Sequence, residues 1–143
     1  MDKKTLFNKL VAFITSVNRI THEFSRDAKS DIITPVQFNI LEYIAVTQPV
    51  TLSQISQCQD MSMPNASREL KKLTENNLIE KIDDIDDRRK QFIRLSKDGE
   101  IMMNEAFKHI EAKFLSRIKD VSEEDLEDIY RALDILHSKL FFD

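Results

Sequence analysis

The sequence predicts a mostly α-helical fold of the α+β class, with six helices and one β-hairpin. Apolar side chains recur at helical spacing over most of the 143 residues, and the period changes towards two in one short region, residues 78–95. The chain has one glycine and three prolines, which argues against an all-β sandwich because that fold needs many tight turns. With 41% hydrophobic residues, the chain can bury a core.

The first predicted helix covers residues 3–29. Its apolar residues Leu6, Leu10, Phe13 and Val17 follow spacings of four and three, as in a helix that packs along a seam. A second apolar stripe runs beside the first, so the apolar face is too wide for one small domain to cover. This width predicts a dimer, although burial within the chain would also satisfy it.

Three shorter helices follow, and each begins at a capping signal. Residues 34–37 (Thr-Pro-Val-Gln) and 51–54 (Thr-Leu-Ser-Gln) both read as capping boxes, in which side chains satisfy the first free N–H groups. The first of these helices is expected to end near Thr47, before a proline. Ser62 caps the third helix, with Pro64 in its first turn.

Residues 78–83 and 91–95 alternate in polarity and predict two strands, joined by the charged loop 84–90. Ser96 then caps a helix of about 22 residues, and Ser122 begins the last helix. Two short helices joined by a tight turn and followed by a hairpin form a helix-turn-helix with a wing.

Composition excludes several classes of function. Gly99 is the single glycine, so glycine-rich phosphate loops and the GxSxG elbow are absent. One cysteine excludes an internal disulfide and fits a reducing compartment. No apolar run approaches the roughly 18 residues that span a bilayer, and no signal peptide is evident, so we expect a cytoplasmic protein without a membrane partner. The net charge of −4 gives no basic footprint for nucleic acid.

Residues 87–99 carry the most specific motif. They follow the pattern D-x-R, five residues, then L-T-x-x-G, with Ser96 in place of the threonine. This segment resembles the MarR family of winged helix-turn-helix transcriptional regulators, and residues 62–70 resemble the recognition helix of that family. The resemblance implies a homodimer held by residues 1–33 and 97–143, and a DNA-binding winged lobe at residues 34–96. It also implies regulation of transcription, with repression as our expectation, and often release by a small-molecule effector.

The resemblance assigns DNA contacts to the third and fourth helices and to the wing. Asn65 is suited to pair with adenine and Arg68 with guanine, because a recognition helix presents its N-terminal residues to base edges. By resemblance, Asp87 holds Arg89 while the arginine enters the minor groove, where negative potential is concentrated. The predicted DNA-binding residues are Ser53, Gln54, Ser62, Pro64, Asn65, Ser67, Arg68, Lys71, Lys72, Asp87, Arg88, Arg89 and Lys90.

Two features depart from the family pattern. Asn77 stands where the family often has glycine, and asparagine tolerates the left-handed conformation of a helix cap. Residues 60–95 hold eight basic and eight acidic side chains, so the lobe has no net positive charge. Asp84 and Asp86 would repel DNA unless they turn inward or pair with neighbouring cations. A dimeric protein-interaction module with the same fold therefore remains the alternative.

No catalytic residues, cofactor or metal site are predicted. His22, His109 and His137 are far apart in sequence and lack ligand spacing. Cys58 is interpreted as a small buried hydrophobe, with a redox sensor as the alternative. The effector-binding residues stay unknown. Residues expected near the junction of the first, second and fifth helices are Phe13, Val17, His22, Phe38, Tyr43 and Met102.

Overall fold

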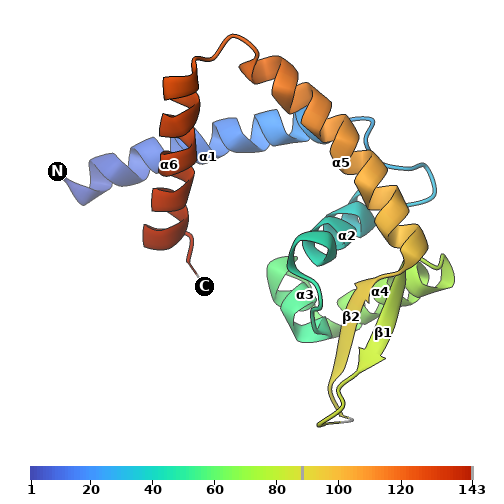
Figure 1. Ribbon diagram of the computed structural model, residues 1–143. Coiled ribbons are helices and arrows are strands. Elements are labelled where there is room, and N and C mark those ends of the chain that lie inside the picture. The colour runs from blue at the N-terminus through green and yellow to red at the C-terminus, as the bar shows by residue number, and fades with distance from the viewer. Residues whose placement is uncertain (88, 143) are drawn as a thin grey trace. The chain divides into compact units, whose positions relative to one another are not determined.

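The computed structural model describes residues 1–87 and 89–142 of the chain. Six helices and a two-stranded antiparallel sheet are found there, which confirms the predicted mostly helical α+β fold (Figure 1). The elements are α1 (Lys3–Ser25), α2 (Pro35–Thr47), α3 (Leu52–Cys58), α4 (Met63–Glu75), β1 (Ile79–Asp83), β2 (Gln91–Leu95), α5 (Lys97–Ile118) and α6 (Glu123–Lys139).

The predicted capping signals fix the starts of the central helices. The Thr34 hydroxyl accepts from the Gln37 backbone N–H at 3.1 Å, and the Thr34 N–H donates to the Gln37 side chain at 3.0 Å. Thr51 and Gln54 form the same reciprocal pair at the start of α3. Ser96 caps α5, since its Oγ accepts from the Gly99 N–H at 2.9 Å. These contacts satisfy backbone groups that a helix end leaves free.

The end of α4 passes directly into the hairpin. Asn77 has a left-handed φ of 57°, and the Leu78 N–H donates to the Leu73 carbonyl at 3.0 Å, as in a Schellman cap. The strand therefore begins at Ile79, one residue later than predicted. The register pairs Ile79 with Leu95, and Val50 extends the sheet through two hydrogen bonds with Ile93 at 3.0 and 2.6 Å.

The core belongs to the winged lobe. It gathers side chains from α2, α3, α4, both strands and the first half of α5. The largest fully buried side chains are Ile40, Leu41, Ile44, Val50, Ile55, Leu73 and Met103. Gly99 lies against the Leu78 backbone so closely that a Cβ there would be 2.0 Å from the Leu78 carbonyl oxygen. This packing places the hairpin and α5 firmly against the three short helices.

The first helix ends at Ser25, four residues before the predicted end. Arg26 is already extended, and Asp27 has a left-handed φ of 67°, so the helical backbone stops there. By internal contacts the chain forms two compact units, Met1–Ile110 and Glu111–Asp143. The division into residues 34–96 and the flanking dimerisation region concerns an assembly and stays a prediction. In the described residues, every helix is too short or too polar to cross a bilayer.

Candidate nucleic-acid interface

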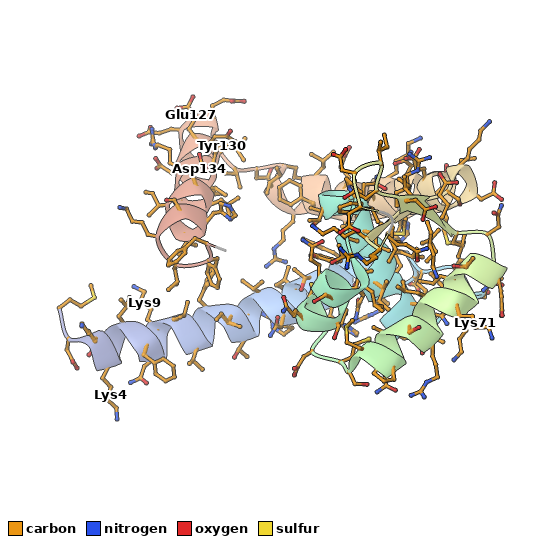
Figure 2. All side chains as sticks on the ribbon, turned by 90° about the horizontal axis from the view of Figure 1, so that it is seen from below. Lys4, Lys9, Lys71, Glu127, Tyr130 and Asp134 are labelled. Atoms are coloured by element: carbon orange, nitrogen blue, oxygen red, sulfur yellow. The ribbon has the colours of Figure 1, made fainter. Side chains whose placement is uncertain are left out.

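The outer face of α4 is available for contacts. Ala66, Leu70 and Leu73 point into the core, as their spacing predicts. The rotation of the helix therefore leaves the predicted contact residues of this helix exposed to solvent. These exposed residues are Pro64, Asn65, Ser67, Arg68, Lys71 and Lys72. Lys71 projects outward from α4 in Figure 2.

Asn65 and Arg68 form one polar unit at the start of α4. The Arg68 guanidinium donates to the Asn65 side-chain oxygen, across one helical turn. Because the Asn65 amide is neutral, this contact does not compensate the positive charge of Arg68, which can still attract an anionic partner. Ser62 accepts from the Asn65 N–H at 3.2 Å and is exposed, which leaves its hydroxyl hydrogen free to donate.

The predicted backbone-positioning residues of α3 are also exposed. Ser53 and Gln54 lie in the first turn of this helix. The Gln54 carbonyl oxygen accepts from the Thr51 N–H at 2.8 Å, so this side chain is fixed by the cap. Its amide NH₂ group can still donate to a phosphate oxygen.

The wing holds an arginine in the position that the sequence motif indicates. One oxygen of Asp87 accepts from the Arg89 backbone N–H at 3.0 Å and from its Nε at 3.3 Å. The Arg89 side chain is 93% exposed, whereas Asp87 is half-buried. Lys90 is exposed beside it, and Arg88 lies outside the described residues. The arginine is thus tethered at its base with its guanidinium in solvent.

Several acidic side chains of the lobe are occupied by partners. Glu80 pairs with Arg94 across the strands at 2.7 Å, and Glu69 pairs with Lys72 at 3.7 Å. Asp84 accepts from the Asp86 N–H at 3.0 Å, so its carboxylate is turned to the loop backbone. These contacts take acidic groups out of competition with phosphate.

The structure adds Lys81 to the candidate cations. Lys81 of β1 and Lys71 of α4 line one cavity of about 400 Å³ between the helix and the hairpin. The sequence analysis missed Lys81, although its exposed position in an alternating strand was a usable signal. Glu75 also lines this cavity, so its charged residues carry a net charge of one positive, whereas the lobe as a whole is balanced.

Comparison with known proteins agrees with this geometry. Residues 33–90 match the model of the MarR family. The HTH-type transcriptional regulator TcaR of Staphylococcus aureus is 27% identical over 135 residues, covering 92% of this chain and 88% of TcaR. Over residues 33–90 the chain is therefore similar to the MarR family. Its fold is that of a MarR family protein from Bacillus stearothermophilus, with a TM-score of 0.77, 20% identity and 99% of each chain covered.

A second solved structure of similar fold was determined with nucleic acid. This is a single-residue mutant of S. aureus MepR bound to an oligodeoxyribonucleotide, with a TM-score of 0.58 and 22% identity. The match covers 90% of this chain and 97% of MepR.

The chain also has a cavity of about 340 Å³ that is lined by residues of α1, α2 and α5. Two of the six residues expected near this junction, His22 and Phe38, line it. Met102 lines a separate hollow with His109. The other three, Phe13, Val17 and Tyr43, are not among the lining residues. The lining residues are Asn18, Thr21, His22, Phe24, Ser25, Phe38, Asn39, Glu42 and Ile110.

The sequence analysis missed Glu42 in this cavity. It is the one charged residue in the stretch 35–47, which is otherwise apolar or neutral, and that isolation was the available signal. Burial raises the pKa of the Glu42 carboxyl above its ordinary value.

Cys58 and the histidines have no assembled site in the described part of the chain. Cys58 is exposed at the end of α3, so its interpretation as a buried hydrophobe was wrong. The helix is so short that its inward face is filled by Ile55. Within residues 1–87 and 89–142, no cluster of three or more His, Cys, Asp or Glu is placed to hold a metal ion.

Proposed function

We propose that this protein is a sequence-specific DNA-binding transcriptional regulator that represses from a pseudo-palindromic operator, to which it binds as a homodimer. The observation that carries this proposal is that the lobe exposes two polar units. One is the Asn65–Arg68 contact on α4, and the other is the Asp87–Arg89 contact on the wing. A helix suits the major groove, and an extended guanidinium suits the narrow minor groove. The oligonucleotide in the MepR neighbour supports DNA as the partner, and a DNA partner supports a cytoplasmic location.

The exposed apolar faces of α1 and α6 support the homodimer. Both helices are described over their whole length, and neither has a buried residue. Both present large apolar side chains to solvent, including Phe7 at 60% and Leu133 at 60% exposure. Contiguous apolar surface of this kind marks an interface. Two lobes related by a two-fold axis would present their recognition helices about 34 Å apart, one turn of DNA.

We propose further that a small-molecule effector releases the DNA by binding the cavity at α1, α2 and α5. Its volume of about 340 Å³ is within the range of small-ligand sites, and apolar and polar groups converge on it.

A gel shift with the DNA upstream of the gene for this chain tests the proposal. If about six phosphates are neutralised per dimer, log affinity should fall with log salt at a slope near −5. Arg89→Ala should weaken binding to all sequences. Arg94→Ala is the matched control, because it removes the same charge from the same hairpin but from a residue already paired with Glu80.

Two results would contradict the proposal. A flat salt response would remove phosphate contacts from the mechanism. Failure to shift any DNA at low salt would favour the alternative, a dimeric protein-interaction module with a winged-helix fold.

A further inference from the structure

We infer that the cavity at α1, α2 and α5 takes an organic cation with an aromatic or apolar body. This inference rests on the proposed effector role of the same cavity. It names the class of ligand, which neither the fold nor the family match determines.

The charge of the cavity comes from Glu42. Among the residues that line it, Glu42 is the acidic one, and the lining contains no lysine or arginine. Within the described part of the chain, the Glu42 carboxylate has no hydrogen-bond or ion-pair partner. A half-buried carboxylate without a cation is costly, so a positively charged ligand gains the attraction that the protein itself leaves unused.

The hydroxyl groups of the cavity favour the same sign of charge. The Thr21 Oγ1 donates to the Val17 carbonyl at 2.8 Å, and the Ser25 Oγ donates to the Thr21 carbonyl at 3.0 Å. Each hydroxyl has one hydrogen, so both groups can present only oxygen lone pairs to a ligand. The side-chain donors left for an anion are the amides of Asn18 and Asn39 and the His22 ring, whereas a cation finds hydroxyl and amide oxygens and a carboxylate.

Aromatic walls complete the site. Phe38 is buried and Phe24 half-buried, and both line the cavity with Ile110. An aromatic face attracts a desolvated cation and also packs against an apolar body.

The neighbouring hollow does not reverse this preference. It shares His22, Ser25, Phe38 and Asn39 with the cavity, which makes the two continuous. Its further charged residues are two basic, Arg26 and Lys29, and two acidic, Asp27 and Asp31, so they balance. With His22 neutral, the residues that line the cavity and this hollow together have a net charge of −1, which comes from Glu42.

Isothermal titration with two ions of nearly the same shape tests the inference. Tetraphenylphosphonium is a permanent cation, and tetraphenylborate is the corresponding anion. The whole chain should bind the cation at least tenfold more tightly than the anion. Glu42→Gln should weaken cation binding about tenfold and leave anion binding unchanged or stronger.

Two further variants control for charge and folding. Glu100→Gln makes the same change in net charge at an exposed residue that lines neither this cavity nor the neighbouring hollows, and it should leave both affinities unchanged. Asn39→Asp adds a carboxylate to the lining and should raise cation affinity about threefold, so the inference is still tested if Glu42→Gln does not fold.

Equal affinity for the two ions, or a Glu42→Gln variant that binds the cation as the parent does, would overturn the inference. A parallel gel shift separates it from the proposed function. DNA binding without cation preference refutes the ligand class and leaves the regulator standing. Glu42-dependent cation binding without DNA binding supports the cation site and refutes the regulator.

Discussion

The winged lobe and the terminal helices α1 and α6 differ in whether their apolar side chains are buried. In the lobe, the helices α2, α3 and α4 and the hairpin bury their apolar side chains against one another, with Ile40, Ile44 and Leu73 fully covered. In α1 and α6, both described from end to end, the apolar stripes are as regular, yet no residue of either helix is buried. The difference teaches that the lobe carries its own core, whereas the terminal helices leave apolar surface exposed for the proposed dimer to cover.

Gly99→Ala is expected to have the largest effect, and it tests whether the core of the lobe depends on close packing of α5 against Leu78. A Cβ at this position would be 2.0 Å from the Leu78 carbonyl oxygen and 3.0 Å from its carbon, and both are backbone atoms that cannot rotate away. We expect a loss of at least about 3 kcal/mol of unfolding free energy, measured by urea denaturation. Lys97→Ala in the same helical turn is exposed and should change stability little. Unchanged stability of Gly99→Ala would mean that α5 does not pack against the strand as described.

The proposal that the exposed apolar stripe of α1 forms a dimer interface is tested by Leu6→Glu. Leu6 lies on the apolar stripe of α1 and is 54% exposed, so a charge there should act on an interface and not on the fold. We expect the dimer dissociation constant to rise about 100-fold, equivalent to about 3 kcal/mol, by analytical ultracentrifugation. Asn8→Glu, on the opposite side of the same helix, should leave it unchanged. If both variants stay equally dimeric, the apolar stripe of α1 is not the interface.

Arg68→Ala separates base reading from folding within the lobe. The side chain is exposed, so unfolding should be unaffected. DNA affinity should fall by about 1–3 kcal/mol and base preference should relax at one position of each half-site. Selection from a randomised operator library measures both effects. A variant that binds weakly with unaltered base preference would make Arg68 a phosphate contact.

Glu42→Gln should have the smallest effect on stability, and its sign depends on pH. Burial raises the pKa of this carboxyl in the folded state. The free energy of unfolding therefore falls as pH rises from the ordinary carboxyl pKa through the folded-state pKa. Over this range the unfolded chain ionises Glu42 more readily than the folded chain does, which favours the unfolded state. The glutamine variant should be slightly more stable than the parent at pH 7 and equal to it near pH 4, by thermal unfolding at both pH values. A variant less stable at pH 7 would mean that the carboxylate has a partner.

Local chemistry explains why most of the fold was predictable. Four helix starts are marked by a hydroxyl side chain that accepts from the backbone N–H three positions later, and all four contacts are present in the structure: Thr34, Thr51, Ser62 and Ser122. The tether between Asp87 and Arg89 is equally local. Such contacts depend on spacing along the chain, which the sequence displays directly.

Contacts between distant residues explain what was missed. Lys81 and Lys71 line one cavity because the hairpin lies against α4. Glu42 is half-buried at a cavity whose lining comes from α1, α2 and α5. The exposure of Cys58 likewise depends on which face α3 turns inward. None of these follows from periodicity, which gives the face of a helix but not its neighbour.

Gln37 connects the start of α2 with α4 through its side chain. Its side-chain oxygen caps α2 by accepting from the Thr34 N–H, and its amide donates to Glu69 of α4 at 3.1 Å. The next residue, Phe38, is in the wall of the cavity at α1, α2 and α5. Gln37 and Phe38 are thus adjacent in the chain, one hydrogen-bonded to α4 and the other lining the cavity. In the proposed function, this glutamine is the direct covalent and hydrogen-bonded connection between the effector cavity and the helix that reads DNA.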